Sequence, residues 1–179
     1  PRSLVCFDIS HAQGKDTVAS CVWFENGRAK RSEYRKFKVE TVQGIDDFAS
    51  MREVVGRYFR RRLEEERPLP DLVVIDGGKG QLNAAREALE AHGLTELPLI
   101  SLAKREEEIF VLGRSESVRI PRRSPALRML QQARDEAHRF AVTFQRKRRA
   151  VRTVTSELMS IPGVGPTKRR QLLTHFGSV

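Results

Sequence analysis

The chain has 179 residues, enough for one full domain and a small additional segment. Its 33 Lys and Arg residues against 23 Asp and Glu residues give a net charge of +10, which favours a polyanionic partner, most simply nucleic acid. No segment is long and apolar enough to cross a bilayer and no signal-peptide pattern opens the chain, so we expect a cytoplasmic protein without a membrane partner. Two cysteines, Cys6 and Cys21, lack the spacing of zinc ligands and are expected to be small buried residues.

The first forty residues predict a three-stranded meander. Strands are expected at residues 3–9, 16–25 and 31–39, and Asn26 and Gly27 suit a tight turn because both accept positive φ. Apolar residues then recur at helical spacing from Phe48 to Leu63, and prolines at positions 68 and 70 end that helix. The chain therefore begins with a small sheet and continues into a helix.

The second half alternates strands with helices. An apolar strand at 71–76 is typical of a strand buried on both faces, and it precedes a helix at about 81–91, a short strand through Leu102 and a hairpin around Gly113. The longest helix starts at Ser124-Pro125, a favourable helix beginning. Its expected buried stripe consists of Leu127, Leu130, Ala137, Ala141 and Phe144. This order predicts an α/β fold with a mixed sheet flanked by helices.

Two aspartates end apolar strands, and a histidine lies in the long helix. Asp8 follows the run Leu4–Phe7, Asp76 follows Leu72–Ile75, and His138 lies at the rim of the buried stripe. A carboxylate at the end of a buried strand costs free energy unless a cation or hydrogen bonds meet it. Carboxylate oxygens suit Mg²⁺ or Mn²⁺, ions that support phosphodiester hydrolysis. We therefore predict a metal site at Asp8 and Asp76, with His138 as metal ligand, general base or general acid.

A glycine-rich loop, Gly77–Gln81, follows Asp76 directly. It lacks the spacing GxxxxGK[ST] of a phosphate-binding P-loop, so no nucleotide cofactor is expected. Its glycines permit a sharp turn from strand to helix and a close backbone approach to DNA. Lys79 in this loop either lies near a DNA phosphate or is simply solvated.

Basic residues gather toward the end of the chain. No acid occurs between Arg139 and Ser156, whereas six residues of this stretch are cations: Arg139, Arg146, Lys147, Arg148, Arg149 and Arg152. They favour a track for the DNA backbone, with a charged helix end as the alternative. The segment Ile161–Pro166 lies between two helical stretches and is typical of the hairpin in a helix-hairpin-helix unit. In such a hairpin Gly163 and Gly165 present backbone N–H groups to a phosphate, and Lys168 follows.

Four motifs in order, CFDISH at 6–11, IDGGKGQ at 75–81, RDEAH at 134–138 and IPGVGP at 161–166, together resemble the C-terminal half of the UvrC family, the nuclease component of the excinuclease in bacterial nucleotide excision repair. The resemblance covers nearly all of the chain. It implies a ribonuclease H-like endonuclease domain at 1–152 and a partial, all-α helix-hairpin-helix DNA-binding module at 153–179.

The same resemblance implies a function and a set of site residues. The family makes the incision on the 5′ side of a lesion in double-stranded damaged DNA, uses a divalent metal, and in its full-length form works with the helicase subunit of the excinuclease. Its Asp-Asp-His triad maps onto Asp8, Asp76 and His138. A further family acid falls on Asp47, for which we expect a capping or supporting role. The competing hypothesis is a nucleic-acid-binding module without catalysis, in which the acids are structural.

Overall fold

The computed structural model describes residues 1–11, 17–42, 44–104 and 106–176, with the backbone alone for 144–157, 159 and 176. The chain divides into two compact units, Pro1–Ala141 and Val142–Val179. Among the residues described, we find no helix that is both long and apolar enough to span a membrane.

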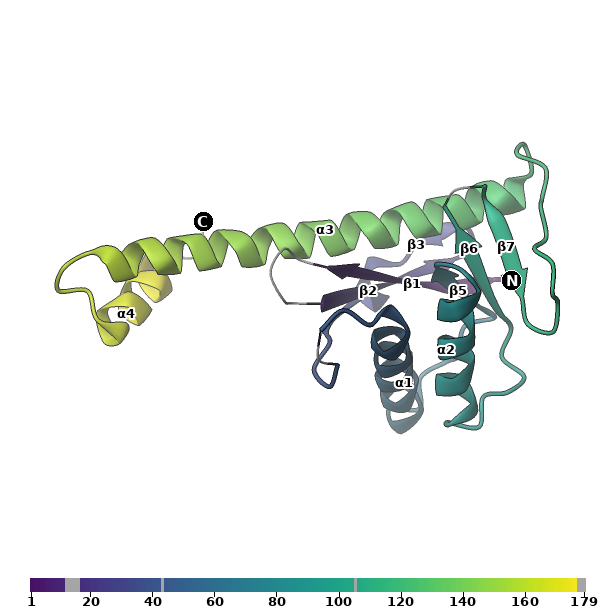
Figure 1. Cartoon of the computed structure of the whole chain (residues 1–179), viewed down its shortest axis with the longest axis horizontal. Coiled ribbons are helices and arrows are strands. Elements are labelled where there is room, and N and C mark those ends of the chain that lie inside the picture. Colours follow the sequence, from purple (N-terminus) through teal and green to yellow (C-terminus); the bar gives the residue numbers. More distant parts are fainter. Residues whose placement is uncertain (12–16, 43, 105, 177–179) are drawn as a thin grey trace. The chain divides into compact units, whose positions relative to one another are not determined.

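A seven-stranded mixed sheet forms the centre of the first unit (Figure 1). The strands are β1 (Ser3–His11), β2 (Thr17–Glu25), β3 (Arg28–Ala29), β4 (Arg35–Lys38), β5 (Leu72–Asp76), β6 (Leu99–Ala103) and β7 (Glu108–Val111). Their order is β3-β2-β1-β5-β6-β7, and β4 also pairs with β2. β1 is antiparallel to β2 but parallel to β5, which in turn is parallel to β6. The strands β1, β5 and β6 therefore run in the same direction, and β1 continues beyond the level at which β5 ends.

Helices cover both faces of this sheet. α1 (Asp47–Glu64) and α2 (Lys79–Glu90) lie on one face, and the first part of α3 (Pro125–Ser160) lies on the other (Figure 1). Side chains of β1 alternate between the faces: Val5 and Phe7 join the core under α1 and α2, whereas Leu4 and Cys6 join the core under α3. This arrangement confirms the predicted mixed sheet flanked by helices, and both cysteines are buried and free as expected.

The long helix buries the stripe that its spacing predicted. Leu127, Leu130, Ala137 and Ala141 are all buried, which leaves the small alanines nearest to the strands and brings the helix close to the sheet. The fifth member, Phe144, has a side chain outside the described residues. The helix begins at Pro125, as predicted. Its close approach to the sheet places the residues beside Ala137 over the centre of the fold.

Two predicted strands are shorter than expected. The stretch 31–39 is interrupted by a 3-10 turn at Arg31–Glu33, and only β4 continues it. The turn allows Glu33 to accept from Arg62 at 3.0 Å and from Arg67 at 2.7 Å, contacts that no local pattern shows. In the hairpin around Gly113, β7 forms but the second arm contributes a single bridge, Ile109 to Val118, to the sheet.

The second unit holds the end of α3 and α4 (Pro166–Phe176), joined by a short turn. Gly163 in that turn has a φ of +81°, a conformation that favours glycine. The domain boundary that we expected after residue 152 falls inside α3.

Candidate active site

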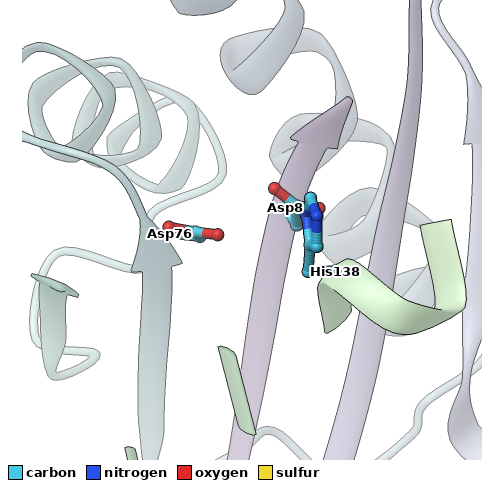
Figure 2. Close-up of side chains that lie close together, drawn as sticks. All are labelled: Asp8, Asp76 and His138. Atoms are coloured by element: carbon cyan, nitrogen blue, oxygen red, sulfur yellow. The ribbon is translucent and has the colours of Figure 1, made fainter. Parts of the chain in front are cut away.

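Asp8 and Asp76 lie side by side, but only Asp76 ends its strand as predicted, because β1 continues past Asp8 to His11. In the β1–β5 pairing Phe7 is opposite Ile75, so the next residue of each strand, Asp8 and Asp76, lies at the same level of the sheet. His138 approaches from α3 on the same face (Figure 2). One ligand atom from each of the three side chains lies within 4.8 Å of the others. The structure thus brings together the three residues that the sequence singled out.

Asp8 is held by hydrogen bonds although it is buried, with a relative exposure of 4%. Its Oδ2 accepts from Ser10 Oγ at 3.0 Å and lies 3.2 Å from His138 Nδ1. Ser10 is two residues further along β1 and therefore points to the same face. These contacts fix the carboxylate in one orientation and bring the imidazole ring against it.

A buried hydrogen bond joins α3 to the sheet next to His138. Ser20 Oγ donates to the carbonyl oxygen of Ala137 at 2.7 Å, one residue before the histidine. Ser20 is also the β2 partner of Asp8 in the β1–β2 register. Ser20 therefore binds α3 and also lies opposite Asp8 in the sheet. The His138 side chain keeps 48% of its surface exposed, so its ring also meets solvent.

Asp76 carries a buried oxygen without a hydrogen-bond partner. Its Oδ2 has none among the described residues, and Lys104 Nζ lies 3.6 Å from it. Burial and the nearby charge of Asp8 raise the pKa of Asp76 from 3.8 to about 6, against the opposing attraction of Lys104, Arg134 and His138. A bound cation would satisfy this oxygen and remove the repulsion between the two carboxylates.

The supporting residues that we predicted lie outside this group of three. Asp46, not Asp47, caps α1: its Oδ1 accepts from the backbone N–H of Phe48 at 3.0 Å and of Ala49 at 2.9 Å. Asp47 instead pairs with His11 Nε2 at the other face of the strand end. The expected capping role therefore belongs to the neighbouring residue. A supporting role for Asp47 at the active site stays a prediction.

Lys79 is the first residue of α2. Its Nζ donates to the carbonyl oxygen of Ser115 and lies 5.8 Å from the centre of the Phe110 ring. The structure therefore gives Lys79 a contact with the hairpin that follows β7. A role for it beside a DNA phosphate stays a prediction.

The predicted DNA-binding residues all lie in the second unit. Arg146, Lys147, Arg148 and Arg149 belong to α3, and their side chains lie outside the described residues. Gly163, Gly165 and Lys168 are exposed. Their exposure is compatible with phosphate binding, which stays a prediction.

Sequence reasoning missed three residues around the site. Ser10 shares the face of Asp8, a signal present in the alternation of strand residues. Arg134 lies one helical turn before His138 and forms an ion pair with Glu107 at 2.7 Å. Lys104 follows β6 and reaches Asp76 only because β6 is the neighbour of β5. That adjacency could not be derived from the sequence without the strand order.

A mixed sheet with two aspartates side by side on neighbouring parallel strands, and a histidine from the covering helix, defines a ribonuclease H-like nuclease domain. Residues 1–142 match the family described as "UvrC RNAse H endonuclease domain". The chain belongs to this UvrC family.

Similar proteins cover the whole chain. It is 76% identical over 179 residues to "UvrABC system protein C" of Gemmatimonas aurantiaca, covering 100% of this chain and 29% of that protein. It is 58% identical over 180 residues to the protein of the same name in Koribacter versatilis, covering 100% of this chain and 30% of the other. The chain therefore spans about three tenths of the length of these curated relatives.

Among solved structures the likeness is more distant. Endonuclease V of Ciona intestinalis, in complex with an inosine-containing 24mer DNA, has a TM-score of 0.43 and 17% identity, covering 57% of this chain and 46% of that one. Human ENDOV has a TM-score of 0.40 and 18% identity, covering 58% and 46%. At this distance the likeness carries no argument about the chemistry of this chain.

Proposed function

We propose that this domain is a divalent-metal-dependent DNA endonuclease that makes the 5′ incision next to a lesion in nucleotide excision repair. The observation that carries the proposal is the cluster of Asp8, Asp76 and His138, whose ligand atoms lie within 4.8 Å of one another in a domain of the UvrC family. The cluster includes the buried, unpartnered oxygen of Asp76, which a cation would satisfy.

Asp8 and Asp76 are the proposed ligands, and Mg²⁺ or Mn²⁺ is the proposed ion, because hard carboxylate oxygens suit hard cations. When bound, such an ion polarises the phosphate and lowers the pKa of its water. The chain supplies the orientation: Ser10 holds Asp8, and the β1–β5 pairing sets the spacing of the two carboxylates. No nucleotide cofactor is part of this scheme.

His138 is proposed to move a proton. Its Nδ1 is held by Asp8 at 3.2 Å, and about half of its side chain, 48%, meets solvent. A ring anchored on one side and exposed on the other can exchange a proton with water or with the leaving oxygen. The hydrogen bond from Ser20 to Ala137 keeps that ring in register with the sheet.

The proposed substrate is damaged double-stranded DNA, and the net charge of +10 supports a polyanionic partner. Arg146, Lys147, Arg148 and Arg149 of the first domain (1–152) are proposed to follow the DNA backbone. Gly163, Gly165 and Lys168 are proposed to do the same from the helix-hairpin-helix module (153–179). The relatives are named as parts of the UvrABC system, which supports the helicase subunit of the excinuclease as the partner of the full-length protein.

Asp8→Asn tests the proposal. The purified chain, and the reconstituted excinuclease with a damaged duplex, should lose Mn²⁺-dependent nicking while DNA affinity stays within about twofold of the wild type. Asp71→Asn is the matched control, because Asp71 lies at the opposite end of the sheet and accepts from the backbone of Arg2 and Ser3. Nicking that survives Asp8→Asn contradicts the proposal. DNA binding by the wild type without any metal-dependent cleavage would instead support a non-catalytic binding module.

A further inference from the structure

Among the residues that the structure describes, Lys104 is the one that forms an ion pair with the buried carboxylate oxygen of Asp76. It directly follows β6, and in the β5–β6 pairing Asp76 is opposite Leu102. Lys104 lies in the turn beyond β6, two residues after Leu102, whose side chain is buried under α3. Its Nζ lies 3.6 Å from Asp76 Oδ2. The sheet order therefore places one lysine beside the proposed metal ligands.

The ion pair between these two residues is long, and its two side chains differ in exposure. A separation of 3.6 Å is longer than a hydrogen bond, and Asp76 Oδ2 has no such bond among the described residues. The lysine side chain is 55% exposed, whereas that of the aspartate is 7% exposed. A lysine ammonium is strongly hydrated and sits on a flexible stem, so it can leave this oxygen at little cost. A divalent ion bound to the same oxygen would repel it.

Glu107, three residues after Lys104, is tied to α3. Glu107, at the far end of the same turn, pairs with the buried Arg134 at 2.7 Å, and its φ of +55° is unusual for a residue with a side chain. Arg134 lies one helical turn before His138. The turn is thus tied to the helix that carries the histidine. The ammonium of Lys104 must remain within a side chain's length of the site wherever it moves.

We propose that Lys104 is a positioning residue that exchanges partners: it pairs with Asp76 when the site holds no divalent ion, and with a phosphate oxygen of the nucleic acid when an ion is bound. An ammonium group binds phosphate as a point charge and needs no fixed geometry, which suits a side chain that must move. Because of this exchange, the carboxylates of Asp8 and Asp76 always have a cation beside them, either Lys104 or the divalent ion. The inference rests on the proposed function, because it requires both a divalent ion and a nucleic acid at this site.

Lys104→Ala should change two affinities in opposite directions. Mn²⁺ binding to the protein alone, measured by electron paramagnetic resonance, should tighten by about two- to fivefold, since the competing cation is gone. DNA affinity should fall in Ca²⁺, an ion that also takes carboxylate oxygens. In Ca²⁺ the slope of log K against log salt should become less steep by about 0.9, the value of one phosphate contact. In EDTA the slope should not change. Lys104→Arg should restore the Ca²⁺ slope.

Lys30→Ala is the matched control. Lys30 also forms an exposed lysine–carboxylate pair, with Glu25 at 2.9 Å, but Glu25 ends β2 and is remote from Ser20, the β2 partner of Asp8. The Lys30→Ala variant should keep the Mn²⁺ affinity of the wild type and its salt slopes in both Ca²⁺ and EDTA. Thermal unfolding of each variant confirms that it is folded.

The possible failures are distinguishable. If the wild type binds Mn²⁺ but Lys104→Ala leaves that affinity unchanged or weaker, the exchange is wrong and the proposed function stands. If the slope falls equally in EDTA and in Ca²⁺, Lys104 is a fixed phosphate contact and the exchange is again wrong. If the wild type does not bind Mn²⁺ at all, the proposed function and this inference fall together.

Discussion

Replacing Asp76 by Asn should stabilise the metal-free protein while removing its activity. Burial and the charge of Asp8 raise the pKa of Asp76 from 3.8 to about 6, so the ionised side chain destabilises the folded state. That difference corresponds to about 3 kcal/mol of unfavourable free energy. Solvent at the rim of the site screens part of it, so we expect a gain of about 1–2 kcal/mol in the free energy of unfolding. For a chain of this size the gain corresponds to about 2–8 °C in Tm.

The assay is thermal unfolding in EDTA at two pH values. The folded state takes up a proton at Asp76 below a pH of about 6, whereas the unfolded state does so only near 3.8. The wild type therefore gains stability as the pH falls from 7.5 to 4.5, and Asp76→Asn cannot. The advantage of the variant should be full at pH 7.5 and much smaller at pH 4.5.

Two results would refute this reasoning. A variant less stable than the wild type at pH 7.5 would mean that the carboxylate already has partners that stabilise it. An equal difference at both pH values would mean that its titration is not the cause. Asp71→Asn serves as the control, because hydrogen bonds from backbone N–H groups lower the pKa of Asp71, and its replacement should destabilise the protein.

Two further predictions concern the histidine and its support. His138→Asn should abolish nicking but weaken Mn²⁺ binding by no more than about tenfold, because we assign proton transfer to this residue, which contacts the proposed ligand Asp8; a loss well beyond about a hundredfold in Mn²⁺ affinity would make it a metal ligand instead. Ser20→Ala leaves the carbonyl of Ala137 without its hydrogen bond, so we expect a loss of about 1 kcal/mol in the free energy of unfolding and slower nicking at unchanged Mn²⁺ affinity. Weaker Mn²⁺ binding in Ser20→Ala would show that the bond supports the aspartates rather than the helix.

The main features of the site were predictable from the sequence because they depend on local patterns. Asp8 and Asp76 each follow an apolar run, and the pairing of two neighbouring parallel strands brings them together, although β1 continues past Asp8 to His11. His138 was predicted at the rim of the buried stripe, and the structure places it against Asp8. The spacing of apolar residues and the lengths of the apolar runs were sufficient to predict where these residues lie. The family resemblance made the same assignments independently.

The parts that were not predicted depend on contacts between distant residues. Lys104 reaches Asp76 because β6 pairs with β5. The order of strands in a sheet cannot be predicted from the sequence of any one segment. The 3-10 turn at Arg31–Glu33 forms where Glu33 meets Arg62, which comes from α1. The choice of Asp46 rather than Asp47 as helix cap was a local question, but neighbouring aspartates are equivalent by residue type. Tertiary pairing decided each of the first two, and backbone geometry decided the third.

The most direct test of the central claim is a crystal of this chain soaked in Mn²⁺ and measured for anomalous scattering. We predict an anomalous peak bound by carboxylate oxygens of both Asp8 and Asp76, at about 2.0–2.3 Å from each, with Lys104 turned away from Asp76. A peak bound elsewhere, or a site at which Asp76 still faces Lys104 and no ion, would contradict the claim that these two aspartates hold the catalytic metal.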